Sequence, residues 1–354
     1  MTFGLFPKAQ LDGYSAFLIL GAVMRRREFI ALAGGAAFSG PLTAQAQQNV
    51  LPVVGILMGY GQSDPEAQSR LKALVDGLRE LGWHEGENCK IEIRWAEADV
   101  PRTQLLAREL VSLQPKVILA NTTPVTAALQ NLTDIIPIVF AGVSDPVGEG
   151  FVKTLAKPGG NITGFINQEG AIVGKWLQLL KEIDPSLKKA AAIFNPETAT
   201  GLASYFLPSF EAAAEASKIS PVLVPVYSDA DIEQKISSLG TGPEIGLVII
   251  PDGGFMTVHR KVVVAQASRF KIPAASHLRI FSMDGLLLSY GPDYSDIFRR
   301  SASYVDRILK GATAMDLPVQ VPTKFDLVFN LRTAKALDLA ISPTLLARAD
   351  EVIE

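Results

Sequence analysis

Cysteine and histidine are scarce in this chain of 354 residues. Cys89 is the only cysteine, so the chain cannot form an internal disulfide. The three histidines, His84, His259 and His277, are not spaced with one another or with an acidic residue as metal ligands would be. The fold must therefore be held together by its apolar core, for which 48% of the residues are available.

Catalytic and nucleotide-binding motifs are absent as well. No Gly-x-Ser-x-Gly nucleophile elbow occurs, and Gly59 and Gly61 lack both the third glycine of a dinucleotide fingerprint and a Gly-Lys-Ser/Thr sequence. The net charge of −3, without a Lys/Arg-rich patch beyond the N-terminal segment, argues against a nucleic-acid partner. These absences predict a binding protein rather than an enzyme, with no cofactor and no metal ion.

An apolar run follows three arginines, Arg25 to Arg27, near the start of the chain. The run ends before Ala44-Gln45-Ala46, a small-x-small cleavage site. It is too short to span a bilayer, which needs about 20 residues. A short buried helix is the alternative, but the order of charge, apolar run and cleavage site favours a twin-arginine export signal over residues 24–46. We therefore expect the mature chain to begin near Gln47 in the periplasm, and residues 1–23 to be an upstream extension, untranslated or disordered.

Beyond residue 50, short apolar runs alternate with helical patterns. Residues 53–58 (VVGILM) form a continuous apolar run, typical of a strand buried on both faces in a parallel sheet. A helix follows, with Ser63 or Asp64 as its cap and an apolar stripe that ends at Gly82. The same alternation restarts after the Gly/Asn-rich stretch 158–170. The sequence therefore predicts an α/β fold of two doubly wound parallel-sheet lobes joined by a hinge.

Polar side chains follow many of the predicted strands. In open parallel sheets, ligands bind beyond the carboxyl ends of the strands, so these side chains are the candidates for a binding site. They are mostly hydroxyls, amides and carboxylates, which suit hydrogen bonding to a ligand rather than bond breaking. The candidates are Tyr60, Gln62, Asn121, Thr122, Thr123, Ser144, Asp145, Asn195, Asp252 and Tyr290.

Each candidate also has a purely structural interpretation. Thr122 and Thr123 could hold a carboxylate at a helix N-terminus, or only cap that helix. Asp252 could pair with an ammonium group, or only cap the helix expected from Gly254 onward. Asp145 is expected chiefly as a cap with lone pairs left for a ligand, and Tyr60 and Tyr290 could stack on a flat ligand or simply pack. The sequence leaves these alternatives open.

Two long stretches carry a family resemblance. "FAGVSDPVGEGFVKTLAKPGGNITG" (residues 140–164) and the segment that begins "LLLSYGPDYSDIFRRSASYVDRILKG" and runs to Glu354 resemble the exported solute-binding proteins of ABC transporters in the tryptophan/tyrosine-type group. The resemblance extends from Leu51 to Glu354. It implies a type I periplasmic-binding-protein fold in which the chain crosses between the lobes near Asn161–Phe165, His277–Gly285 and Leu317–Pro322. We accordingly expect lobe 1 to comprise residues 50–163 and 283–318, and lobe 2 residues 164–282 and 319–354.

The resemblance and the missing catalytic motifs together predict a solute-binding protein of an ABC importer. Such a protein would hold a small molecule, an amino acid or related carboxylate, between its lobes and deliver it to a membrane permease with its ATPase. It would have no stable insertion in the membrane. Two alternatives remain at this point: a ligand-sensing module for a receptor, and an exported α/β enzyme acting on a small carboxylate.

Overall fold

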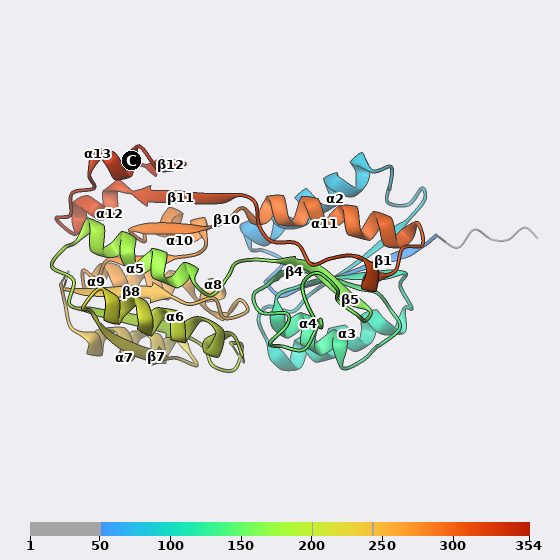
Figure 1. Cartoon of the computed structure of the whole chain (residues 1–354), viewed down its shortest axis with the longest axis horizontal. Helices are drawn as coiled ribbons and strands as arrows, with labels where there is room; N and C mark the ends of the chain where they lie inside the picture. The colour runs from blue at the N-terminus through green and yellow to red at the C-terminus, as the bar shows by residue number, and fades with distance from the viewer. Residues whose placement is uncertain (1–50, 200, 243) are drawn as a thin grey trace, which may run out of the picture. The chain divides into compact units, whose positions relative to one another are not determined.

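The computed structural model describes residues 51–199, 201–242 and 244–354 (Figure 1). The expected export signal at 24–46 and the extension at 1–23 lie outside the described residues. In the described part of the chain, no helix is both long enough and apolar enough to cross a membrane.

The first lobe is built on a five-stranded parallel sheet. Its central strands are fully buried, as expected for a sheet with helices on both faces. Figure 1 shows this sheet on the right, beside helices α3 and α4. In spatial order the strands are β2 (Lys90–Trp95), β1 (Val53–Met58), β3 (Val117–Asn121), β4 (Ile138–Val143) and β5 (Ile162–Ile166).

The second lobe is built on a seven-stranded sheet, parallel except for one antiparallel pair, β10 with β11. Two parallel-sheet α/β lobes are therefore present, which confirms the predicted fold class. In spatial order the strands are β12 (Glu351–Ile353), β11 (Phe325–Asn330), β10 (Leu288–Pro292), β9 (Ala274–Ser276), β8 (Ile245–Ile249), β6 (Lys189–Phe194) and β7 (Ser220–Pro225).

Helices cover both sheets. The first lobe carries α2 (Pro65–Glu80), α3 (Val100–Ser112), α4 (Thr123–Gln130) and α11 (Tyr294–Leu309). The second carries α5 (Ile172–Ile183), α6 (Leu202–Ala216), α7 (Asp229–Leu239), α8 (Phe255–Val258), α9 (Arg260–Arg269), α10 (Arg279–Asp284), α12 (Leu331–Ala336) and α13 (Pro343–Leu346). A 3₁₀ turn, η1 (Ala314–Asp316), lies against β5.

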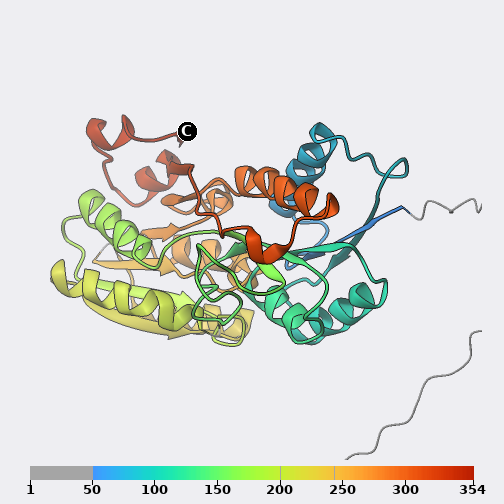
Figure 2. The ribbon, with the colours of Figure 1, turned by 45° about the vertical axis from the view of Figure 1, so that its right-hand side comes forward.

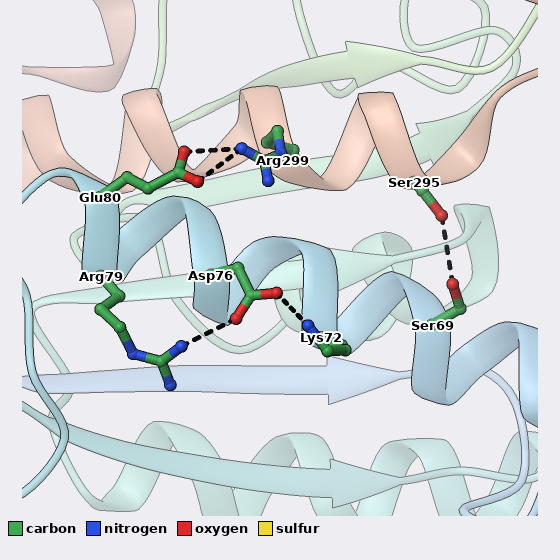
Figure 3. Close-up of polar contacts among 7 residues, drawn as sticks. All are labelled: Ser69, Lys72, Asp76, Arg79, Glu80, Ser295 and Arg299. Carbon is green, nitrogen blue, oxygen red and sulfur yellow. Dashed lines mark hydrogen bonds and ion pairs between the residues drawn. The ribbon is translucent and has the colours of Figure 1, made fainter.

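Helices α2 and α11 pack side by side although they are far apart in the sequence (Figure 2). Helix α2 starts where Asp64 accepts a hydrogen bond from the Ala67 N–H, so Asp64 rather than Ser63, the other candidate, is the cap. On the outer surface of the pair, both Glu80 oxygens accept from Arg299 Nη1 at 2.7 Å (Figure 3). This packing attaches α11 to the first lobe even though the strand before it belongs to the second.

The chain crosses between the lobes at places that differ in part from the expected ones. Strand β5 lies wholly in the first sheet, so the first crossing follows it at residues 167–171. Strand β10 pairs with β9 and β11, so residues 288–292 belong to the second lobe, contrary to the expected range 283–318 for the first. The second crossing is therefore at Asp293, and the third lies at residues 321–324. The lobe to which a short strand belongs depends on the strands with which it pairs, and the local sequence does not specify those partners.

Candidate functional site

The carboxyl ends of β1, β3 and β4 face those of β8 and β9 across the junction of the lobes. A cavity of about 20 Å³ lies there, which is room for about one water molecule. Five of the expected residues line it: Tyr60, Thr122, Thr123, Ser144 and Asp252. A solute larger than water therefore requires the lobes to separate or the lining side chains to move.

Thr122 is available to a ligand because its hydroxyl does not cap the helix that it precedes. The residue has a positive φ of 82°, and no side-chain hydrogen bond caps α4. Its carbonyl instead accepts from the N–H and the hydroxyl of Thr126. The Thr122 Oγ1 atom is buried and has no hydrogen-bond partner among the described residues. The capping alternative is therefore not what the structure shows for this side chain.

Asp252 acts as a cap for the turn that follows it, and it also lines the cavity. Its two oxygens accept hydrogen bonds from the backbone N–H groups of Gly254, Met256 and Asn195 at 3.1–3.4 Å. Burial raises the pKa of this carboxyl to about 7, against the lowering effect of these N–H groups. A cation placed beside the carboxylate would stabilise its charged form.

The other five expected residues lie outside this cavity. The Asn121 side chain accepts from the Gly59 N–H and donates to the Ala141 carbonyl, which ties β1, β3 and β4 together. Asn195 accepts from the N–H groups of two residues in the turn that follows it. The Tyr290 ring stacks on Phe325 with centroids 5.8 Å apart.

The remaining two expected residues lie on loops. Gln62 is exposed, and its carbonyl accepts from Gln68 Nε2. Asp145 lines another cavity, of about 330 Å³, which is also lined by Tyr205 and shares Ser144 with the first, and Asp145 Oδ1 accepts from the Gly148 N–H.

Several residues at the site were not expected from the sequence, among them Asn167, His277, Tyr294 and Arg70. His277 and Tyr294 line the cavity, and Arg70 lies between the rings of Tyr60 and Tyr294. Burial and the nearby charge of Arg70 lower the pKa of His277 to about 3, so its imidazole is neutral. The sequence pattern could have identified one of these residues. Arg70 is a charged residue on the buried stripe of α2, between Ala67 and Leu74 at helical spacing.

A second cavity, of about 220 Å³, adjoins the first and shares His277 and Tyr294 with it. Glu66 and Ser69 of α2 and Asp326 of β11 also line this second cavity. Movement of the shared Tyr294 side chain would join the two spaces.

The lobes also make direct contact around the first cavity. Arg260 Nη1 donates to Asp64 Oδ2 of the first lobe at 2.9 Å, while Arg260 Nε donates to Asp284 Oδ2 of its own lobe at 2.8 Å. A Cβ on Gly253 would lie 2.8 Å from the Pro124 ring, and one on Gly254 would lie 3.3 Å from the Tyr60 ring. These glycines let the β8–α8 loop approach the first lobe closely.

No metal centre is evident at the junction. Among residues 51–199, 201–242 and 244–354, no group of three His, Cys, Asp or Glu side chains is placed to hold an ion. The groups that do converge are a carboxylate, an imidazole, hydroxyls and a buried guanidinium. They suit recognition of a small polar molecule.

Comparison with known proteins adds a family match. The model of a family described as ABC transporter substrate binding protein matches residues 63–353. A protein of Clostridioides difficile named tyrosine-binding protein is 30% identical over 275 residues, which cover 78% of each chain.

Two solved structures are informative. The structure of an ABC domain from Streptococcus pneumonia in complex with L-Trp matches with a TM-score of 0.78 and 25% identity, over 86% of this chain and all of that one. The ligand-free, open structure of a substrate-binding protein with adhesive properties from Clostridium difficile matches with a TM-score of 0.64 and 26% identity, over 86% of this chain and 99% of that one.

Proposed function

Because the chain belongs to the family of ABC transporter substrate-binding proteins, we propose that it binds an amino acid between its two lobes and delivers it to a permease. A solute-binding role for the family agrees with the prediction from the sequence. The identity of the solute, the route of export and the residues that bind are the parts proposed here.

The observation that carries the proposal is a set of buried polar atoms without partners where the lobes meet. Thr122 Oγ1 of the first lobe and His277 Nδ1 of the second both line the cavity and have no hydrogen-bond partner among the described residues. Leaving such a group unsatisfied costs about 1–3 kcal/mol. A solute that contacts both lobes would satisfy these atoms together.

Two relatives favour an amino acid as that solute. One is named a tyrosine-binding protein, and another has a structure with bound L-Trp. The described conformation also resembles the L-Trp complex more than the ligand-free, open structure, with TM-scores of 0.78 and 0.64 at similar identity. This difference supports a closed conformation of the kind that a bound solute would stabilise.

Solute capture then follows from a shift between open and closed forms. The solute touches both lobes only in the closed form, so it stabilises that form by its differential affinity. The cavity at the junction is too small to hold a solute in the described conformation, and separation of the lobes is the route to binding that this mechanism uses. A permease that recognises the closed form would receive loaded protein preferentially.

Export by the twin-arginine route is part of the same proposal. We expect the exported protein to begin near Gln47, because Ala44-Gln45-Ala46 follows the apolar run of the signal. Replacing both Arg26 and Arg27 with lysine should block export, because the receptor reads the arginine pair. Intact mass of the periplasmic protein checks the first expectation. An exported chain that still contained Met24–Ala46 would contradict it.

The solute can be identified directly from the purified protein. We expect protein isolated from cells to release an amino acid on denaturation, detected by mass spectrometry. Titration calorimetry of the emptied protein against the twenty amino acids should then show binding by that one and its close analogues. Absence of binding by every member of the panel would refute the proposed solute class, and chemical turnover of the bound solute would favour the enzymatic alternative.

A further inference from the structure

We propose that Arg70 binds the carboxylate of the solute. It would so make the cleft, by which we mean the two adjoining cavities at the junction of the lobes, selective for molecules with an anionic group. The proposal rests on the proposed function, because it concerns the same cleft. It adds a specificity-determining residue that lies on helix α2 rather than at the end of a strand.

The environment of Arg70 is unusual for a cation. The residue is 1% exposed, and Nε, Nη1 and Nη2 all lack a hydrogen-bond partner among the described residues. A buried charge is normally paired or hydrogen-bonded, because removing it from water is costly. Glu66, one turn earlier on the same helix, makes no hydrogen bond with the guanidinium, although its negative charge favours the charged form of Arg70.

Two tyrosines hold the guanidinium from its faces. The Arg70 Cζ atom lies 4.8 Å from the ring centroid of Tyr60 and 4.2 Å from that of Tyr294. Such cation–π contacts stabilise the charge, but they do not supply hydrogen-bond acceptors, and no Arg70 nitrogen has a hydrogen-bond partner among the described residues. The N–H groups around its edge therefore still need an acceptor.

The position of this stack relates Arg70 to the solute. Both tyrosines line the cavity between the lobes, and Tyr294 also lines the adjoining cavity, together with Ser69, which precedes Arg70 in α2, and Glu66, one turn earlier. Arg70 lines neither cavity in the described conformation, but it packs against Tyr294, which lines both, so movement of Tyr294 would open Arg70 to a solute. A planar guanidinium with free N–H groups matches the two oxygens of a carboxylate.

The cleft offers a complementary group in the other lobe. Asp252 lies in the second lobe and lines the same cavity. A guanidinium from one lobe and a carboxylate from the other would together bind a zwitterion, and both contacts would form only on closure. The competing explanation is that Arg70 is a spacer that keeps Tyr60 and Tyr294 apart.

The test compares solutes with and without a carboxylate. L-tyrosine and L-tryptophan serve as probes beside tyramine and tryptamine, which keep the ring and the amine. We expect wild-type protein to bind the amino acids at least tenfold more tightly than the amines, and Arg70→Gln to lose at least tenfold of that preference. Arg70→Lys keeps the positive charge but lacks the planar guanidinium, so it should lose part of the preference for the amino acids.

A matched control uses an arginine outside the cleft. Arg299→Gln removes the ion pair with Glu80 on the outer surface of α2 and α11 (Figure 3), and it should leave the preference unchanged. Equal preference in wild type and in a folded Arg70→Gln protein would overturn the proposal and leave Arg70 as a spacer. If Arg70→Gln fails to fold, the test uses Arg70→Lys instead. A preference for amino acids over amines equal to that of wild type would then overturn the proposal.

A failure of the proposed function gives a different result. If no amino acid binds, thermal shifts with benzoate and benzylamine still test Arg70. Stabilisation by benzoate alone that disappears in Arg70→Gln would support an anion site without an amino-acid solute. No difference between the two compounds in wild-type protein would overturn the Arg70 proposal as well.

Discussion

Replacing Gly253 with alanine is expected to weaken solute binding by about fivefold to 150-fold, because the added methyl group obstructs closure. Its Cβ would lie 2.8 Å from both Cγ and Cδ of Pro124, which belong to a rigid ring in the opposite lobe. Overpacking of this kind costs about 1–3 kcal/mol. Because Pro124 lies in the opposite lobe, this clash destabilises only the closed form and therefore lowers the affinity. Titration calorimetry with the identified solute measures the loss.

The control for this substitution is another glycine with nearly the same backbone conformation. Gly253 has φ of +76° and Gly150 has φ of +72°, but a Cβ on Gly150 would have no neighbour within 4 Å. Gly150→Ala should therefore lower thermal stability through backbone strain and leave the affinity for the solute unchanged. The contact that a Cβ at 253 would make with the Thr198 carbonyl lies within one lobe, so it should also lower stability. Unchanged affinity in Gly253→Ala would mean that the lobes do not close at this contact.

Replacing Asp252 with asparagine is expected to weaken binding of a solute with an ammonium group by tenfold or more. A charge-assisted hydrogen bond contributes about 1.5–3 kcal/mol, and asparagine keeps the shape while removing the charge. The pH dependence gives a second signature. The pKa of Asp252 is about 7 in the empty protein, so protonation below pH 7 should weaken binding by up to about tenfold per pH unit.

The asparagine variant provides the comparison for both effects. Calorimetry between pH 5 and pH 8 should show the fall in affinity in wild type and its absence in the variant. Because burial raises this pKa above its unfolded value, the contribution to stability is present at low pH and lost as the pH rises to about 7. The stability of wild type relative to the variant should therefore be greater at pH 5 than at pH 8. Equal affinity of both proteins for a confirmed cationic solute would leave Asp252 only as a cap.

The sequence predicted part of the candidate site and missed the rest for a definable reason. Reading the ends of the strands identified Tyr60, Thr122 and Asp252, because in a parallel sheet strand direction alone decides which end carries the loops of the site. The same rule also selected Asn121 and Tyr290, whose side chains turned out to have partners within their own lobes. Whether a side chain at a strand end faces the gap or the interior depends on contacts that sequence periodicity does not encode.

The sequence by itself determined the alternation of strands and helices and placed the start of α2 at Ser63 or Asp64. These are local properties, because apolar spacing and capping residues act within one or two turns of the chain. Only the tertiary structure decided that β10 joins the second sheet, and that Arg70 lies between Tyr60 and Tyr294, the latter being more than two hundred residues away along the chain. Sheet membership and the convergence of residues at a cleft are set by pairing and packing between distant segments, which a single sequence does not specify.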